Sequence, residues 1–102
     1  MYVRITWGRL NPGSWDEYEA AYVKASDVDT DIPGFRGRLL ARDTDDADTG
    51  VSISFWDSRE ELESYEQGTM KEHLLPLLNK FFAGEYSVSR FEVRHERGLG
   101  FH

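Results

Sequence analysis

Residues 50–68 have the sequence GVSISFWDSREELESYEQG. The first part, 51–56, alternates apolar and polar side chains, as a half-buried β-strand does. Ser58 follows, with Glu61 three residues later, which is the capping-box signature of a helix start. The stretch therefore predicts a strand that leads directly into a helix, and Gly68 marks a break in that helix.

The same strand–helix order occurs at the beginning of the chain. Residues 2–10 alternate in the same way, and the turn sequence Asn-Pro-Gly occupies 11–13. Ser14 and Glu17 repeat the capping box, so a helix is expected from here to about residues 29–31. This part of the sequence predicts a first β-α unit.

The remaining segments complete a β-α-β-β-α-β order. Residues 35–42 form an alternating strand, and the acidic loop DTDDADT at 43–49 joins it to the strand described above. A further helix follows the break at 68–69 and contains Pro76, which should kink or restart it. Residues 86–94 form the last strand. This order is typical of a ferredoxin-like α+β fold, with an antiparallel sheet and both helices on one face.

The composition is that of one small acidic domain. The chain has 102 residues, 12 Lys and Arg, 19 Asp and Glu, a net charge of −7 and no cysteine. Cysteine-based metal sites and thiol nucleophiles are therefore excluded. Without an apolar run of membrane-spanning length or a signal-peptide core, we expect a cytoplasmic protein with no membrane partner. Residues 1–97 are predicted to form the domain, and 98–102 a flexible tail.

Strand parity separates two faces of the predicted sheet. One set is apolar and is expected under the helices: Val3, Ile5, Trp7, Val51, Ile53, Phe55, Phe91 and Val93. The other set is rich in arginine and is expected to face water, a second copy of the chain, or nucleic acid. RNA is disfavoured because Val51 and Ile53 stand where stacking aromatics belong. The side chains expected at a dimer interface are Arg36, Arg38, Trp56, Tyr86, Val88 and Arg90.

The acidic residues do not predict a metal site. Asp27, Asp29 and Asp31 open like a calcium loop, but its sixth position is Ile32 and its twelfth is Arg38. Calcium loops need glycine and a bidentate glutamate at those positions. The three histidines lie on separate predicted elements, so no metal is expected.

Three segments, in order, resemble the antibiotic biosynthesis monooxygenase family of dimeric α+β barrels. They are PGFRGRLLARD, GVSISFWDSREELESYEQG and MKEHLLPLLNKFF, following the first β-α unit. The resemblance covers about Val3 to Val93. It implies a homodimer whose sheets face each other, and a small-molecule pocket in each subunit between sheet and helices. Relatives of this kind include cofactor-free oxygenases of polyketide-type phenols, quinol oxygenases and haem-degrading enzymes.

The haem-degrading branch uses an asparagine, a tryptophan and a histidine, and the matching positions here are Thr6, Tyr65 and His73. Only the histidine is kept, so haem degradation is disfavoured. For a phenol oxygenase, the resemblance favours His73 and Tyr65 as catalytic residues. The expected substrate-binding residues are Trp7, Tyr18, Tyr22, Phe55, Met70 and Leu77.

The chemistry of such a pocket follows from what the sequence lacks. No flavin, nicotinamide or phosphate-loop signature is present, so no cofactor is expected and the substrate must supply the electrons for a redox step. A deprotonated phenol or enol can reduce dioxygen itself. The protein then provides a base, an aromatic cavity and a hydrogen bond to the developing oxyanion. His73 has the intrinsic pKa for the base.

Three functions stay open at this point. The first is a cofactor-independent monooxygenase of a hydroxylated aromatic, polyketide-like or quinol substrate. The second is a non-redox cyclase or isomerase that uses the same pocket. The third is a non-catalytic ligand-binding dimer in which His73, Tyr18 and Tyr22 are structural residues.

Overall fold

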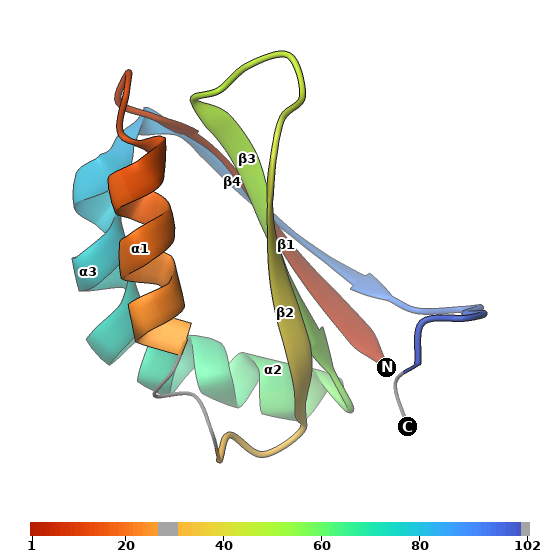
Figure 1. Cartoon of the computed structure of the whole chain (residues 1–102). Coiled ribbons are helices and arrows are strands. Elements are labelled where there is room, and N and C mark those ends of the chain that lie inside the picture. Colours follow the sequence, from red (N-terminus) through yellow and green to blue (C-terminus); the bar gives the residue numbers. More distant parts are fainter. Residues whose placement is uncertain (27–30, 101–102) are drawn as a thin grey trace.

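The computed structural model describes residues 1–26 and 31–100, without the side chains of His73, Leu74 and Leu77. Four strands and two helical regions alternate along the chain, with every helix on one side of the sheet (Figure 1). In order, the elements are β1 (Tyr2–Leu10), α1 (Trp15–Ser26), β2 (Phe35–Arg42), β3 (Thr49–Trp56), α2 (Arg59–Tyr65), the π-helical segment η1 (Glu66–Leu74), α3 (Leu75–Leu78), the 3-10 turn η2 (Asn79–Phe81) and β4 (Phe82–Glu92).

The four strands form one antiparallel sheet in the order β2-β3-β1-β4. In its centre, Ile5 of β1 lies opposite Ile53 of β3, and Ile53 lies opposite Leu39 of β2. The two edge strands are therefore β2 and β4. This topology confirms the predicted ferredoxin-like α+β fold.

The second helical region is continuous where the sequence predicted a break at residues 68–69. The backbone widens to π-helical geometry over η1, and the amide of Leu75 donates to the carbonyl of Met70, five residues earlier. Pro76 follows as the second residue of α3, where the chain returns to α-helical geometry. The wider turns absorb Gly68 and the missing amide of Pro76 without ending the helix.

The helix starts differ from each other. Ser58 caps α2 as predicted, since its hydroxyl accepts from the amide of Glu61 at 3.2 Å. Ser14 instead donates its hydroxyl to the carbonyl of Asn11 at 2.6 Å, so the first capping box is not formed. The last strand also starts earlier than predicted, at Phe82, and passes through Gly84 with a φ of 95°.

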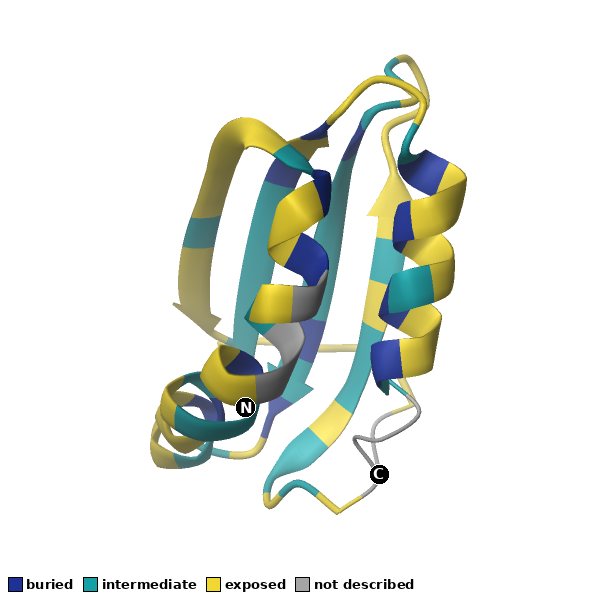
Figure 2. Ribbon diagram, turned by 90° about the vertical axis from the view of Figure 1, so that its left-hand side faces the viewer, coloured by how far each residue is buried: buried dark blue, intermediate teal, exposed yellow. Residues whose placement is uncertain are grey.

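Two groups of buried side chains fill the space between the helices and the sheet (Figure 2). The first joins α1 to η2 and the end of β1 and comprises Leu10, Trp15, Tyr18, Tyr22, Leu78 and Phe81. The second joins α2 and η1 to β3 and comprises Trp56, Leu62, Tyr65 and Met70. Both groups contain large aromatic side chains, which pack between the helices and the sheet.

The predicted assignment of the sheet faces is wrong, and the two faces are exchanged. Trp56, completely buried, packs against Tyr65 of α2 with 4.7 Å between ring centroids. On the same face, Ser52 bonds Tyr22 of α1 and Arg4 pairs with Glu66 of η1. Parity correctly separates two sets of side chains, but it does not indicate which set the helices cover. Polar strand residues are buried here because helix side chains pair with them.

The other side of the sheet carries the apolar set and has no helix over it (Figure 1). We call this surface the open face, and its side chains are Val3, Ile5, Trp7, Leu39, Val51, Ile53, Phe55 and Phe91. Leu39 is 44% exposed and Phe91 54% exposed. The open face is thus the uncovered apolar surface of the sheet.

Because the two faces are exchanged, the side chains predicted at a dimer interface lie on the helix side or at the edge of the sheet. Trp56 is unavailable to a partner because it is fully buried within the chain. Arg38 lies over the rings of Phe35 and Tyr65, and Arg90 binds Glu66. Tyr86 and Val88 line a pocket on the helix side, described below. Arg36, at the edge, pairs with Asp57.

Candidate functional site

A pocket opens between the sheet and the helices, with α1 on one side and η1, α3 and η2 on the other. Its empty volume is about 480 Å³, including the part open to solvent. We call it the helix–sheet pocket, and its lining comprises Arg4, Thr6, Tyr18, Tyr22, Ser52, Met70, Leu75, Leu78, Asn79, Phe82, Tyr86 and Val88.

Helix α1 supplies two tyrosines to this pocket. Tyr18 and Tyr22 are one turn apart on the buried side of the helix, with 6.1 Å between their ring centroids. The Tyr22 hydroxyl and the Ser52 hydroxyl share a hydrogen bond of 2.6 Å, which fixes the helix against β3. The pair therefore forms an aromatic wall whose position is set by the sheet.

The hydroxyl of Tyr18 is available to a ligand. Burial, with a smaller contribution from the neighbouring Tyr22, raises the pKa of Tyr18 from 10.0 to about 12. Within the described part of the chain, no atom forms a hydrogen bond with this hydroxyl. At neutral pH, Tyr18 is thus a protonated group that can donate a hydrogen bond into the pocket.

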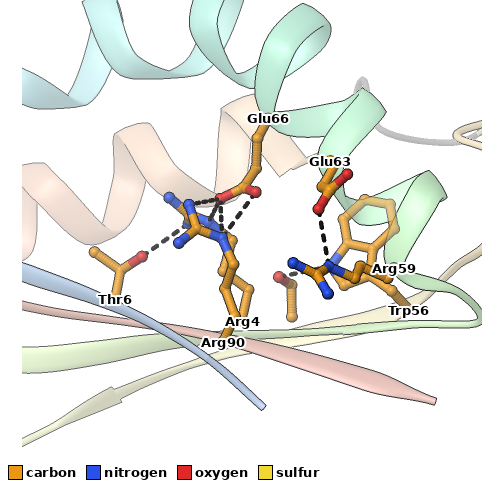
Figure 3. Close-up of polar contacts among 8 residues, drawn as sticks. Arg4, Thr6, Trp56, Arg59, Glu63, Glu66 and Arg90 are labelled. Atoms are coloured by element: carbon orange, nitrogen blue, oxygen red, sulfur yellow. Dashed lines mark hydrogen bonds and ion pairs between the residues drawn. The ribbon is translucent and has the colours of Figure 1, made fainter. Parts of the chain in front are cut away.

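A cluster of three charges, drawn in Figure 3, reaches one end of the pocket through Arg4, which belongs to the pocket lining. Glu66 accepts from Nε of Arg4 at 2.7 Å and from Nη2 of Arg90 at 2.6 Å. The side chains of Arg4 and Glu66 are 12% and 11% exposed, whereas that of Arg90 is 52% exposed. Burial raises the pKa of Glu66, but the hydrogen bonds and charges of Arg90 and Arg4 outweigh it, and the net pKa is lowered. The carboxylate is therefore ionised, with an inner and an outer arginine.

Arg4 is also anchored to the sheet itself. Its Nη1 donates to Oγ1 of Thr6 at 2.8 Å, on the same strand. Nε and Nη1 are thus used, and no described atom accepts a hydrogen bond from Nη2. Because Arg4 lines the helix–sheet pocket, these two contacts hold its guanidinium at the pocket wall.

A narrower recess continues the pocket toward the start of α1. It is lined by Thr6, Gly8, Leu10, Trp15, Tyr18, Gly50 and Phe82, with about 220 Å³ of empty volume including open solvent. A Cβ at Gly8 would collide with the ring of Phe82. Glycine at this position therefore leaves room for the Phe82 ring, which lines both the recess and the helix–sheet pocket.

The structure brings three of the predicted site residues together. Tyr18, Tyr22 and Met70 all line the helix–sheet pocket. Trp7 and Phe55 belong to the open face, on the opposite side of the sheet, because they alternate with the helix-facing residues of β1 and β3. The prediction that these two lie under the helices is wrong for the reason given above.

Tyr65 lies next to the pocket rather than in its lining. It is 4% exposed, stacks on Trp56, and accepts a hydrogen bond from Nη2 of Arg38 at 3.2 Å. His73 belongs to η1, between Met70 and Leu75 of the pocket lining, but its side chain and that of Leu77 lie outside the described residues. The catalytic roles of Tyr65 and His73 remain predictions.

The sequence reasoning missed the polar side chains that the sheet contributes to the pocket. Strand parity puts Arg4, Thr6 and Ser52 in the arginine-rich set predicted opposite the helices, whereas all three line the pocket. A signal was present in the parity itself, since these residues share a face with Trp56, whose size favours burial under helices. Within the described lining there is no carboxylate, so the site offers hydroxyl, guanidinium and amide donors among apolar side chains.

Among the helices described, none is both long and apolar enough to cross a membrane. Likewise, the described side chains contain no group of three or more His, Asp or Glu placed to hold a metal ion.

The fold and the pocket define a ferredoxin-like α+β protein with a partly open, largely apolar pocket between its sheet and its helices. The sequence profile of the antibiotic biosynthesis monooxygenase family matches residues 1–73. The chain therefore belongs to this family, as its sequence resemblance implied. Among curated proteins, no sequence matches the chain significantly.

Solved structures of the family share the fold at low sequence identity. A single-site mutant of SnoaB, a cofactor-independent oxygenase from Streptomyces nogalater, is 17% identical with a TM-score of 0.77; the alignment covers 93% of this chain and 94% of SnoaB. The haem-degrader MhuD from Mycobacterium tuberculosis, with two haems bound in its active site, is 23% identical with a TM-score of 0.80. That alignment covers 96% of this chain and 100% of MhuD.

Proposed function

We propose that the protein is a cofactor-independent monooxygenase that oxidises a small hydroxylated aromatic, polyketide-like or quinol substrate in the helix–sheet pocket. The observation that carries this proposal is the composition of the pocket. Its walls are apolar and aromatic, and its polar side chains are those of Arg4, Thr6, Ser52, Asn79 and the three tyrosines Tyr18, Tyr22 and Tyr86. Such a lining suits a flat aromatic ring that bears oxygen atoms. The family and the fold shared with SnoaB support the same reaction class.

The reaction needs only dioxygen and the electrons of the substrate. A base removes the acidic proton of the ring system, and the resulting carbanion or phenolate transfers one electron to dioxygen. The radical pair combines to a peroxide anion at carbon, which takes back the proton held by the base; the resulting hydroperoxide loses water and leaves a carbonyl. One oxygen atom thus enters the product, and the other leaves in water.

The pocket contributes to two of these steps. Tyr18, with its pKa of about 12, donates a hydrogen bond to the substrate oxygen while charge develops there. His73 is the proposed base, because its intrinsic pKa suits proton removal near neutrality. Tyr65 is proposed to act indirectly, through its contact with Arg38 and the packing of Trp56 beside the pocket.

We further propose that the protein is a homodimer in which two open faces meet. Those faces carry the largest uncovered apolar surface of the sheet, with Leu39 44% exposed and Phe91 54% exposed. Contiguous apolar surface of this kind is typical of an interface. A two-fold dimer would bury each open face against the other and leave both pockets outside the interface.

Oxygen uptake tests the proposed activity. Anthrone, 1-naphthol and hydroquinone serve as donors, with the rate of spontaneous oxidation subtracted. The variant Val88→Trp fills the pocket, whereas Val23→Trp adds the same side chain on the exposed side of α1, where Val23 is 54% exposed. We expect catalysed uptake with at least one donor, lost in Val88→Trp and kept in Val23→Trp. Uptake that survives in Val88→Trp would reject the pocket as the site.

A further inference from the structure

The unusual feature of the pocket is the positive charge that the sheet places in it. The chain as a whole has a net charge of −7, yet two arginines share one carboxylate at this end of the pocket. The Arg4–Glu66–Arg90 cluster therefore carries one net positive charge. Within the described lining, no acidic residue offsets it.

We propose that the pocket binds its substrate as an anion, with Arg4 holding an anionic oxygen of a hydroxylated aromatic. This deepens the proposed function, on which it rests, by naming the charge class of the substrate. The anionic oxygen belongs to a ring carboxylate or to an ionised phenol, since both offer the same acceptor to a guanidinium.

The geometry assigns Arg4 this role because two of its three guanidinium nitrogens are hydrogen-bonded within the protein and the third has no described acceptor. Nε is bound to Glu66 and Nη1 to Thr6, at 2.7 and 2.8 Å, while no described atom accepts from Nη2. A guanidinium held at two points loses little further freedom when a ligand binds to the third. The Tyr18 hydroxyl, in the same lining, supplies a second donor without a described partner.

Arg90 is a positioning residue, which acts on Arg4 through Glu66. It binds Glu66 through two nitrogens, at 2.9 and 2.6 Å, and does not line the pocket. Without Arg90, Glu66 would neutralise Arg4 alone, and the pocket end would have no net charge. Arg90 thereby leaves Arg4 free to attract an anion.

Binding without turnover tests the proposal. The probes are 1-hydroxy-2-naphthoate, 1-hydroxy-2-naphthoate methyl ester and 1-naphthol, measured by calorimetry at neutral pH under anaerobic conditions. The variants are Arg4→Gln, Arg90→Gln and the control Arg59→Gln, which removes an arginine that is 71% exposed and pairs with Glu63 on α2. Circular dichroism checks that each variant is folded.

We expect the carboxylate to bind about tenfold more tightly than its neutral ester, the effect of one charge-assisted hydrogen bond in a shielded site. Arg4→Gln should abolish this preference, Arg90→Gln should reduce it several-fold, and Arg59→Gln should keep it. Tight binding of 1-naphthol that increases as the pH approaches the phenol pKa would identify the phenolate as the anion instead. Either pattern supports the anionic class.

Equal affinity for the acid and the ester without such a pH effect, or no binding of any probe, would overturn the proposal. A preference for the carboxylate over its ester that stays unchanged in both Arg90→Gln and Arg4→Gln would also overturn it. If Arg4→Gln does not fold, Arg90→Gln decides, because its side chain is 52% exposed and outside the pocket lining. Anion preference without oxygen uptake would reject the monooxygenase function alone, and uptake without anion preference would reject this inference alone.

Discussion

Oε2 of Glu66 lies 2.7 Å from Nε of Arg4, and this contact ties the first residue of the π-helical segment to the central strand β1. Both side chains are nearly buried, at 11% and 12% exposure. Removing one partner of a buried ion pair leaves an uncompensated charge. The contact therefore links the stability of the fold to the end of the pocket.

Glu66→Gln should lower the free energy of unfolding by about 3 kcal/mol at neutral pH, because two arginines lose their shared carboxylate. Denaturant unfolding measures this loss. The folded pKa of Glu66 is below its ordinary 4.5, so its stabilisation is complete above that pH and is lost as the pH falls through the lower, folded value. The difference in unfolding free energy between the unaltered chain and Glu66→Gln should thus shrink in acid. A difference that does not depend on pH would contradict the pairing of Glu66 with the two arginines.

Tyr18 should resist ionisation up to strongly alkaline pH. Its folded pKa is about 12 against an ordinary 10.0, so its contribution to stability is complete below pH 10.0 and is lost as the pH rises toward 12. Ultraviolet absorbance of tyrosinate, compared between the unaltered chain and Tyr18→Phe, isolates this residue. Ionisation of Tyr18 near pH 10 would show that its hydroxyl is not buried.

Trp56→Ala should be among the most destabilising single substitutions, at about 4 kcal/mol. The indole is completely buried between Phe35 and Tyr65, and its Nε1 donates to Ser54 at 2.9 Å. Thermal or denaturant unfolding gives the measurement. A loss below about 1 kcal/mol would mean that the helices do not cover this face of the sheet.

Ile53→Asp should convert the proposed dimer to a monomer, because it places a charge in the middle of the open face. The control Val23→Asp puts the same charge on α1, where Val23 is 54% exposed. Sedimentation velocity should show a dimer for the unaltered chain and the control, and a folded monomer for Ile53→Asp. A monomeric unaltered chain would contradict the proposed assembly.

Local sequence signals predicted most of the fold. The strands at 2–10 and 35–42 and the Ser58 cap agree with the structure, because alternation and capping depend on neighbouring residues alone. The π-helical turns of η1 were not predictable in this way. Gly68 and Pro76 have the pattern of a helix break, yet the helix continues through wider turns whose hydrogen bonds span five residues, as from Leu75 to Met70.

The site was predictable only in part, for a related reason. Tyr18, Tyr22 and Met70 lie on helix positions whose periodicity points inward, and all three line the pocket. The strand residues Arg4 and Ser52 were missed because parity gives two equivalent sets, and the apolar set was assumed to be the covered one. Their partners, Glu66 and Tyr22, lie 62 and 30 residues away, at distances over which a single sequence shows no coupling.

In the proposed reaction, dioxygen supplies one atom to the product and the substrate supplies all the electrons. The most direct measurement is oxidation of anthrone under ¹⁸O2 with metal-free protein, with product mass and oxygen consumption followed together. We predict one ¹⁸O atom in each product molecule and one dioxygen consumed for each product formed. The catalysed rate should be lost in Val88→Trp. Catalysed turnover without dioxygen, or product oxygen that comes from water, would contradict it.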